Sequence, residues 1–179
     1  MANQTPKRPF RLVTDGSGHS DGYGGFAAIL TVPGEADVIH RVFGGSTHSS
    51  TDRMEFAALL SGLQYCTERL PSGWLSERLP GDRWPLHWWS DRESLVKSAQ
   101  GLYKRKAAPD LWRSFTYFEE IFEIACAHIT IENYDPESEC PWLVEADSLA
   151  SSLRIVMASA GESFKSVALS KAAIDYGSC

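Results

Sequence analysis

The chain has 179 residues, enough for one domain with a substantial core and too few for two comfortable ones. Its 43% hydrophobic and 22% charged residues describe an ordinary globular protein, and its net charge of -6 excludes a surface coated with basic residues, although a local basic patch is compatible with it. The four cysteines include no C-x-x-C pair, which argues against a structural zinc site and a disulfide framework.

Composition also sets expectations about location and organisation. Residues 1–11 are polar, and no later segment reaches the length of a membrane span, so we expect a cytoplasmic protein that does not associate with a membrane. Nothing implies a protein partner, and we expect a monomer. Residues 1–160 are expected to form one domain, and residues 161–179 a C-terminal extension that is helical or mobile.

The first predicted elements form a β-hairpin that holds Asp15. Arg11–Thr14 has the composition of a short strand, and Asp15 falls at its end, where a glycine-rich stretch begins. A second apolar run, Phe26–Val32, ends at the turn signal Pro33-Gly34. Because glycine lets chain approach chain closely, a glycine-rich turn beside a carboxylate suits a bulky or charged ligand. Asp-Gly also marks ordinary turns, so Asp15 alone is a weak functional candidate.

A third strand and a helix follow. Ala36–Phe43 has β-type composition and completes an antiparallel meander. The small polar residues 44–51 end in Ser and Thr, which are typical helix N-caps, and apolar residues at helical spacing then predict a helix from Asp52 to about Cys66. Glu55 lies in its first turn, where an acid most often serves the helix dipole or closes a capping box.

The fourth strand repeats the arrangement of the first. Residues 67–85 form an excursion rich in proline and glycine, in which one helical turn is expected. The bulky run Leu86–Ser90 then predicts a buried strand, and Asp91 follows it directly, with a helix beginning at or near Asp91. A carboxylate again lies at the C-terminal edge of a strand, where ligands gather in sheets that are covered by helices.

Lys104, Arg105 and Lys106 form a dense cationic run after that helix. Such a run is either a solvated turn between helices or a patch that contacts phosphates. The residue pattern leaves both interpretations open.

The C-terminal part is predicted as helix, strand and helix. A long amphipathic helix covers residues 109 to about 127, and alternation predicts a fifth strand over residues 128–132. After an acidic loop, residues 133–139, a final helix begins near residue 141 and carries Asp147 in its first half. The predicted order is therefore β-β-β-α-β-α-α-β-α, an α/β domain with four acids on separate elements.

Four short motifs on the expected elements resemble a known family. They are VTDGSG after the first strand, TDRMEFAALLSGL at the first helix, WWSDRESLVKS after the fourth strand and ADSLASSLR on the last helix. In this order they resemble the ribonuclease H family, type 1, over about residues 10–157. The resemblance implies a ribonuclease H-like fold, with a five-stranded mixed sheet of three antiparallel strands followed by two parallel strands, flanked by helices.

The resemblance also implies a metal-dependent endonuclease that hydrolyses the RNA strand of RNA/DNA hybrids. Asp15 would bridge two metal ions, Glu55 and Asp91 would hold the first ion and position the attacking water, and Asp147 would help to bind the second ion. The chemistry is compatible, because carboxylates without His or Cys ligands suit Mg²⁺, or Mn²⁺. Two divalent ions would cancel the charge of four carboxylates and supply what phosphodiester hydrolysis needs.

Contacts with the RNA/DNA hybrid are expected on three segments. The candidates are Gly16, Ser17, Gly18, Thr51, Asp52, Lys104, Arg105 and Lys106. Thr51 and Asp52 stand where the family has two amides that touch the RNA strand, so we expect weaker recognition of the 2′-hydroxyl, with Asp52 capping the helix instead.

A loop histidine that the family carries before its last helix has no counterpart in residues 133–139. Glu137 or Glu139 replaces it, or the step goes unassisted. Among the five histidines, His48 is the candidate for the site, because its loop adjoins Glu55.

Two other classes of function stay open. One is a non-catalytic nucleic-acid-binding module that kept the fold and lost turnover; the acidic composition and the missing loop histidine favour it, and the four acids oppose it. The other is a related nuclease of the same superfamily that acts on another substrate. A 3′–5′ exonuclease would carry D-x-E on its first strand, whereas Gly16 and Ser17 follow Asp15 here, and resolvase or integrase cores lack the TDGS and RMEFAALL motifs.

Overall fold

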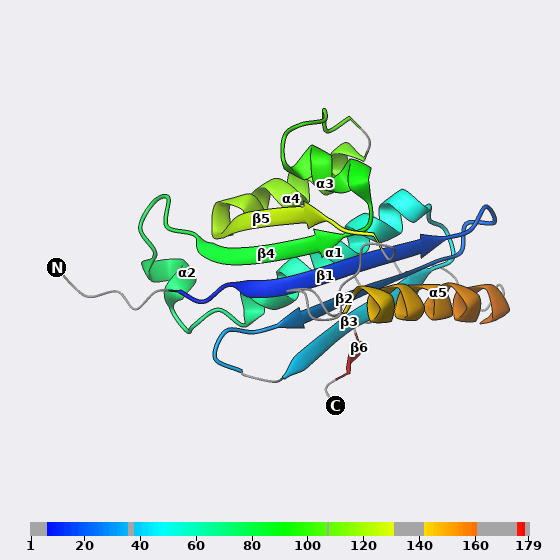
Figure 1. Ribbon diagram of the computed structural model, residues 1–179, viewed down its shortest axis with the longest axis horizontal. Coiled ribbons are helices and arrows are strands. Elements are labelled where there is room, and N and C mark those ends of the chain that lie inside the picture. Colours follow the sequence, from blue (N-terminus) through cyan, green and yellow to red (C-terminus); the bar gives the residue numbers. More distant parts are fainter. Residues whose placement is uncertain (1–6, 36–37, 107, 131–141, 161–174, 178–179) are drawn as a thin grey trace.

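The computed structural model describes residues 7–35, 38–106, 108–130, 142–160 and 175–177 (Figure 1). In chain order the elements are β1 (Phe10–Gly18), β2 (Gly24–Thr31), β3 (Ile39–Ser46), α1 (Thr51–Glu68), α2 (Trp74–Glu77), β4 (Trp84–Ser90), α3 (Glu93–Ala99), α4 (Pro109–Ile121), β5 (Phe122–His128), α5 (Leu143–Ala160) and β6 (Asp175–Gly177). Apart from the short α2 and β6, this is the predicted order. The single helical turn expected before the fourth strand is α2.

The described strands form one mixed sheet in the order β5-β4-β1-β2-β3-β6. β1, β2 and β3 pair antiparallel, whereas β4 pairs parallel with both β1 and β5. The predicted arrangement of three antiparallel strands followed by two parallel strands is therefore confirmed. β6 extends the sheet by three residues that pair antiparallel with β3. It lies in segment 161–179, for which a helical or mobile extension was expected; the rest of that segment is outside the described residues.

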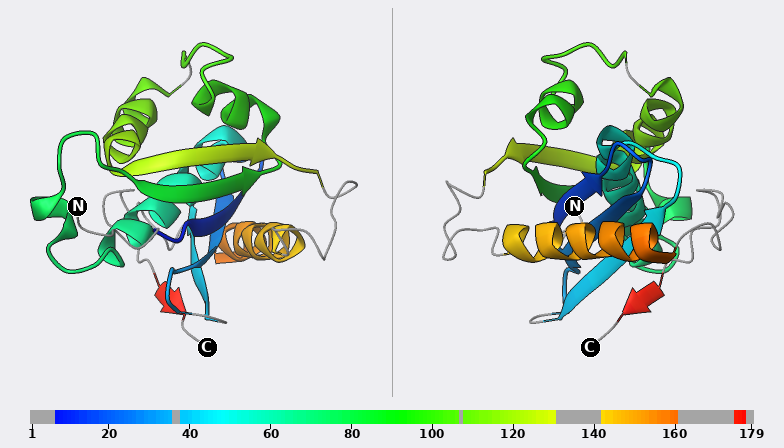
Figure 2. Two further views of the ribbon diagram at one scale, coloured as in Figure 1. Left: turned by 60° about the vertical axis from the view of Figure 1, so that its left-hand side comes forward. Right: turned by 90° about the vertical axis from the view of Figure 1, so that its right-hand side faces the viewer.

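Helices cover both faces of the sheet (Figures 1 and 2). On the face of α1 and α4, Leu12 belongs to a buried cluster with Leu63. On the face of α5, Val13 packs in a second cluster with Leu143 and Ala146. Leu12 and Val13 are neighbours on β1, so the pleat of one strand supplies both cores. None of the described helices combines the length and the apolar composition needed to cross a membrane.

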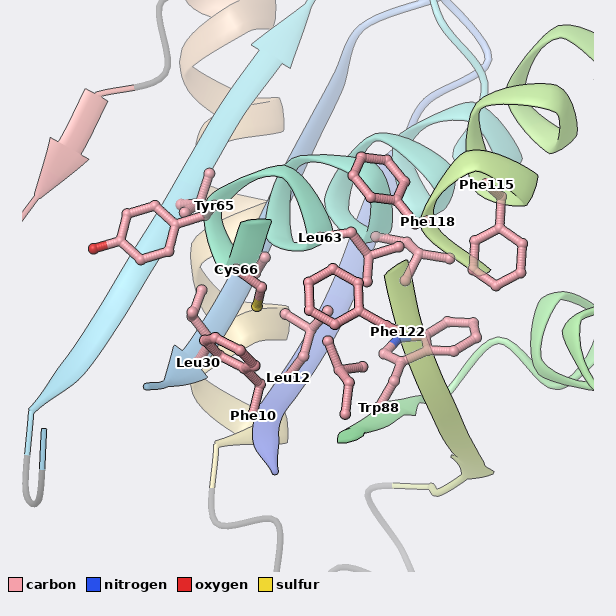
Figure 3. Close-up of a cluster of buried hydrophobic side chains, with 14 of the residues drawn as sticks. Phe10, Leu12, Leu30, Leu63, Tyr65, Cys66, Trp88, Phe115, Phe118 and Phe122 are labelled. Atoms are coloured by element: carbon pink, nitrogen blue, oxygen red, sulfur yellow. The ribbon is translucent and has the colours of Figure 1, made fainter. Parts of the chain in front are cut away.

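Aromatic side chains dominate the larger core (Figure 3). Phe10 and Phe122 meet edge to face with ring centroids 5.9 Å apart, and the fully buried Trp88 lies near Phe115. The Trp88 indole donates through Nε1 to Thr14 Oγ1 at 2.9 Å, which satisfies its polar atom inside the core. This interaction ties β4 to β1 at Thr14, the residue before Asp15.

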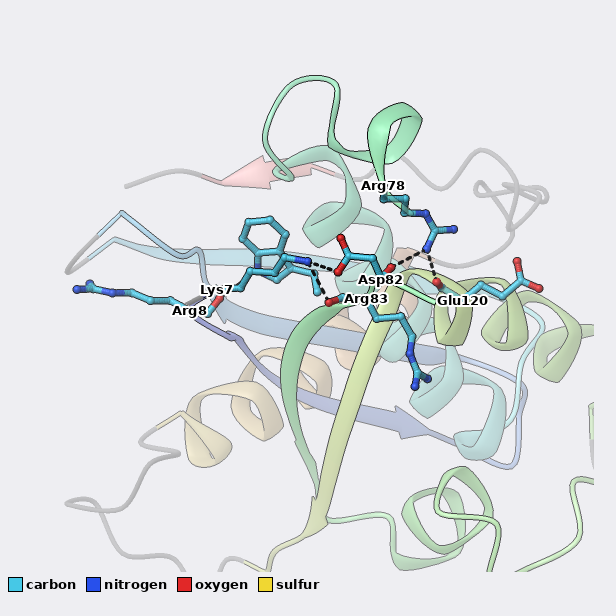
Figure 4. A network of polar contacts seen from close by, with 7 residues as sticks. Lys7, Arg8, Arg78, Asp82, Arg83 and Glu120 are labelled. Atoms are coloured by element: carbon cyan, nitrogen blue, oxygen red, sulfur yellow. Dashed lines mark hydrogen bonds and ion pairs between the residues drawn. The ribbon is translucent and has the colours of Figure 1, made fainter. Parts of the chain in front are cut away.

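A polar network fixes the excursion that precedes β4 (Figure 4). Lys7 donates to Asp82 and lies over the ring of Trp74, so the segment before β1 is tied to this excursion. Arg78 donates to the backbone carbonyls of Asp82 and Glu120, which joins the excursion to α4. Trp74 also packs against the larger core.

α1 approaches β1 closely at two glycines. A Cβ on Gly16 would fall within 3.0 Å of backbone atoms of Met54 and Glu55, and a Cβ on Gly18 would meet Thr51 at a similar separation. Any other residue at either position would force the first turns of α1 away from the strand. These glycines, predicted to form a turn beside Asp15, instead pair with β2 and serve helix packing.

The predicted ends of the first strand and of the long amphipathic helix are wrong, and so is the position of the fifth strand. β1 does not end at Thr14 but continues past Asp15 to Gly18. β5 comprises Phe122–His128 rather than residues 128–132, and α4 ends at Ile121 rather than near residue 127. Ile121, Phe122, Ile124 and Ala125 are apolar at spacings that suit both periods. The parallel pairing of residues 122–128 with β4 decides for a strand.

Gly16→Ala should destabilise the protein, because the added methyl group would overlap the backbone of α1. We expect the free energy of unfolding to fall by about 2 kcal/mol, a usual cost of overpacking, which lowers Tm by about 4–8 °C. Calorimetry on metal-free protein measures the change. Ser20→Ala in the exposed turn of the same hairpin is the control and should stay within about 0.5 kcal/mol of the parent. Equal stability of parent and Gly16→Ala would contradict the close contact.

Candidate metal centre

Asp15 and Asp91 meet because β1 and β4 are parallel neighbours. Ser90, the last residue of β4, pairs with Thr14 on β1, so the next residues along both strands are Asp91 and Asp15. The side chains of these two acids share a hydrogen bond. Asp15 is only 4% exposed, and Asp91 is half-buried.

Glu55 joins them from the first turns of α1. Its backbone lies against Gly16, the residue after Asp15, so the close approach of helix and strand sets the position of its carboxylate. Glu55 is 4% exposed, and the backbone N–H of Gly16 stabilises the ionised forms of both Glu55 and Asp15. The helix is capped by Ser50, whose Oγ accepts from the backbone N–H of Arg53, and not by Asp52 as expected.

Asp15, Glu55 and Asp91 each offer a carboxylate oxygen within 4.8 Å of the others. Asp147, on α5, approaches from the opposite face of the sheet, and its charge acts on both Asp15 and Asp91. The structure thus brings three of the four predicted acids into one tight group, with the fourth near enough to interact with it electrostatically.

Burial and mutual repulsion raise the pKa of all three clustered acids. Burial, followed by the charges of Asp91 and Asp147, raises the pKa of Asp15 to about 7. Burial, followed by the charges of Asp15 and Asp91, raises the pKa of Glu55 to about 9. The pKa of Asp91 is raised first by burial and then by Asp147. The described surroundings therefore do not neutralise the negative charge that full ionisation of the cluster would create.

The cluster has the chemistry of a site for a hard divalent cation. Glu55 Oε2 is buried and has no hydrogen-bond partner among the described residues, which is costly for a carboxylate unless a cation completes its environment. The ligands are oxygens only, as Mg²⁺ and Mn²⁺ prefer. Asp15, Glu55 and Asp91 could therefore hold such an ion, with Asp147 available for a second.

The candidate nucleic-acid contacts around β1 and α1 have mixed environments. Ser17 Oγ accepts from Arg154 Nε on α5 at 2.9 Å, so this hydroxyl is already engaged within the protein. Asp52 is exposed and forms an ion pair with Arg92. His48 is exposed, with Nδ1 3.0 Å from Thr47 Oγ1. Glu137 and Glu139 lie outside the described residues.

The cationic run divides into one half-buried residue that is paired within the domain and two exposed residues. The Arg105 guanidinium donates to both carboxylate oxygens of Glu119, at 2.8 and 2.6 Å, and lies 4.6 Å from the ring centroid of Trp112. Lys104 and Lys106 are exposed and line a cavity of about 120 Å³ between α1, α3 and α4. Arg105 thus stabilises the fold here, and the two lysines are left as the candidate phosphate contacts.

Two residues beside the cluster were not singled out from the sequence. His128, at the end of β5, lies with Nε2 3.0 Å from the backbone oxygen of Asp91. Arg92, directly after Asp91, lies near enough to Glu55 for its charge to lower that residue's pKa. The Asp91-Arg92 dipeptide was a visible signal for Arg92. The contact of His128 was hidden, because it depends on the true position of β5.

The fold is shared with solved ribonuclease H structures. The N-terminal RNase H domain of rv2228c from Mycobacterium tuberculosis matches with a TM-score of 0.63 and 15% identity, over 85% of this chain and 97% of that chain. LC11-RNase H1 in complex with an RNA/DNA hybrid matches with a TM-score of 0.60 and 18% identity, over 82% of this chain and 97% of that one. RNase H1 from the halophilic archaeon Halobacterium salinarum matches with a TM-score of 0.57 and 16% identity, over 82% of this chain and 97% of that chain.

No protein-family model matches the sequence, and neither does any curated protein. At 15–18% identity the structural matches show the fold, which is ribonuclease H-like, and the fold implied by the sequence resemblance is thereby confirmed.

Without metal, the protein should lose stability as pH rises. An acid whose pKa is raised by folding contributes stability that is fully present below its unfolded pKa and is lost as pH rises through its folded pKa. For Glu55 this window runs from 4.5 to about 9, and for Asp15 from 3.8 to about 7. In EDTA, Glu55→Gln should raise Tm at about pH 8 by roughly 4–8 °C, or ~2 kcal/mol, because the amide cannot ionise.

Thermal unfolding across that pH range measures the effect. Glu93→Gln is the control, because exposed Glu93 has its pKa lowered by Lys97 and should leave the downward trend of the parent intact. Mg²⁺ should raise the Tm of the parent at about pH 8 and have little effect on Glu55→Gln. A parent Tm that does not fall with pH in EDTA would refute the picture of uncompensated buried carboxylates.

Proposed function

We propose that this protein is a metal-dependent endonuclease that hydrolyses the RNA strand of RNA/DNA hybrids. The observation that carries the proposal is the cluster of Asp15, Glu55 and Asp91, with Asp147 beside it, on a ribonuclease H-like fold. One matching structure, LC11-RNase H1, is in complex with an RNA/DNA hybrid, which supports a hybrid as the substrate class. A cytoplasmic location and a monomeric state are retained from the sequence as parts of this proposal.

The proposed mechanism assigns a role to each acid. When bound, two Mg²⁺ or Mn²⁺ ions would supply the activation of a water molecule and the neutralisation of charge on the phosphate and on the departing 3′-oxygen. Asp15 would ligate both ions, Glu55 and Asp91 would ligate the first, and Asp147 would help to hold the second. Since Glu55 and Asp15 have raised pKa values, they must release protons when an ion binds, so metal affinity should increase with pH.

Recognition of the hybrid would use the surroundings of the cluster. Lys104 and Lys106 line a cavity that also includes Glu55, so phosphates held by these lysines would lie close to the metal centre. Thr51 and Asp52 follow the cap of α1 at the same end of the domain. Because a carboxylate only accepts hydrogen bonds and Thr has a short side chain, fewer contacts to the RNA 2′-hydroxyl are expected there than two amides would give.

The proposal is tested by incubating purified protein with an RNA/DNA hybrid, double-stranded RNA and each single strand, with and without Mg²⁺. Cleavage confined to the RNA strand of the hybrid, and dependent on Mg²⁺, supports it. Binding of hybrid without cleavage in Mg²⁺ or Mn²⁺ would favour the non-catalytic binding module. Cleavage of another substrate would favour a different nuclease of the superfamily.

Asp91→Asn should reduce kcat for hybrid cleavage by at least about a hundredfold, or ~2.7 kcal/mol, because the amide keeps the size and removes a charged ligand. Hybrid binding should survive, since a negative charge near the phosphates is removed. Steady-state kinetics and a binding isotherm separate the two effects. Asp82→Asn, the same change in the loop before β4, should cleave at the parent rate. Activity of Asp91→Asn within about threefold of the parent would remove Asp91 from the catalytic set.

Replacing Lys104 and Lys106 together with Ala should weaken hybrid binding and flatten its salt dependence by about two units of slope, because about one counterion is released per phosphate contact. Arg105→Ala should instead lower Tm and leave the slope within about 0.5 of the parent, since its guanidinium is bound to Glu119 inside the protein. Binding isotherms over a salt series provide the slopes. If Arg105→Ala reduced the salt slope by a full unit, the assignment of Arg105 to the fold and of the two lysines to phosphate contacts would be wrong.

A further inference from the structure

Arg92 joins the metal-site cluster to the cavity beside it. It follows Asp91 directly and precedes α3, with its backbone N–H donating to Ser90 Oγ at 3.0 Å. Its side chain lines the cavity that also includes Glu55, Lys104 and Lys106. Its charge lowers the pKa of Glu55, which places the guanidinium electrostatically close to the carboxylate cluster.

The hydrogen bonding of Arg92 is incomplete. One terminal nitrogen forms an ion pair with Asp52, in the first turn of α1. The Nε atom is buried and has no hydrogen-bond partner among the described residues. A guanidinium binds an oxyanion best through Nε and a terminal nitrogen together, in a fork that matches carboxylate and phosphate oxygens. In the described conformation only part of that fork is used.

The ion pair between Arg92 and Asp52 is weak enough for another oxyanion to replace Asp52. The side chains of Arg92 and Asp52 are 42% and 62% exposed, so solvent screens their attraction. Releasing Arg92 from Asp52 would also end a conformation in which the buried Nε lacks an acceptor. A phosphodiester entering the cavity offers two non-bridging oxygens to the whole fork.

The cavity suits a backbone phosphate of a nucleic acid. Lys104 and Lys106 add two positive charges, and no described residue forms an ion pair with either of them. Trp112 and Phe56 supply an apolar wall that excludes water from part of the space. Glu55, which also lines the cavity, connects it with the carboxylate cluster.

We propose that Arg92 is a phosphate-binding residue of the nucleic-acid site, and that Asp52 competes with the nucleic acid for its guanidinium. This rests on the proposed function for the identity of the ligand, an RNA/DNA hybrid, but it concerns binding and not hydrolysis. Asp52 therefore restrains Arg92 in the free protein and weakens binding, whatever contact position 52 makes with the RNA strand.

The test measures binding of a hybrid in EDTA over a salt series for the parent, Arg92→Gln, Asp52→Ala and the double variant. Arg92→Gln should weaken binding by about tenfold and reduce the salt slope by about one. Asp52→Ala should strengthen binding by about threefold in the parent and have no effect in the Arg92→Gln background, because its partner is gone. Arg92→Lys should retain the slope and recover only part of the affinity, since ammonium keeps the charge without the fork.

Arg113→Gln is the matched control, because Arg113 is exposed on α4 and does not line the cavity. Its loss should leave both the affinity gain of Asp52→Ala and most of the salt slope in place. Circular dichroism checks that every variant is folded. An unchanged slope for Arg92→Gln would overturn the phosphate contact, and additive effects of Asp52→Ala and Arg92→Gln would overturn the competition.

Single methylphosphonates, which remove the charge of one phosphate, then locate the contact on either strand. At one position the substitution should abolish the difference between the parent and Arg92→Gln; no such position on either strand would refute a defined phosphate contact. A parent that cleaves hybrid but binds it independently of Arg92 rejects this inference alone. A parent that binds through Arg92 but cleaves nothing rejects the proposed function alone.

Discussion

The candidate site depends on one steric condition, the close packing of α1 against β1 at Gly16 and Gly18. Without side chains at these positions, the backbone of the first turns of α1 can lie directly on the strand. This contact brings Glu55 to Asp15, while the parallel pairing of β4 with β1 brings Asp91. Three acids that are far apart in the sequence thus meet through backbone geometry, before any side-chain interaction between them is considered.

This geometry is electrostatically unfavourable in the absence of a cation. Burial and repulsion raise the pKa values of Asp15, Glu55 and Asp91, and an oxygen of Glu55 lacks a partner among the described residues. A domain selected only for stability would gain by placing uncharged side chains there. The cluster therefore resembles functional sites, where unfavourable charge is kept because a ligand compensates it.

The distribution of cations explains how an acidic chain could bind a nucleic acid. Several arginines are used in ion pairs within the domain, namely Arg41 with Glu145, Arg53 with Asp110 and Arg105 with Glu119. Lys104 and Lys106, together with Arg92 in its exposed ion pair with Asp52, line one cavity next to the carboxylate cluster. Positive charge is thus concentrated beside the carboxylate cluster, where it would attract phosphates, although the net charge of the chain is -6.

The sequence alone determined the class of fold, the order of the main elements and the positions of the four acids, because hydrophobic periodicity and local motifs are properties of short segments. Tertiary structure decided what short segments leave ambiguous. Residues 122–128 could form helix or strand until β4 offered a parallel partner. Likewise, Arg105 was indistinguishable from Lys104 until the fold placed it beside Glu119 and Trp112. The pairing of Arg92 with Asp52 joins residues that are 40 positions apart in the sequence.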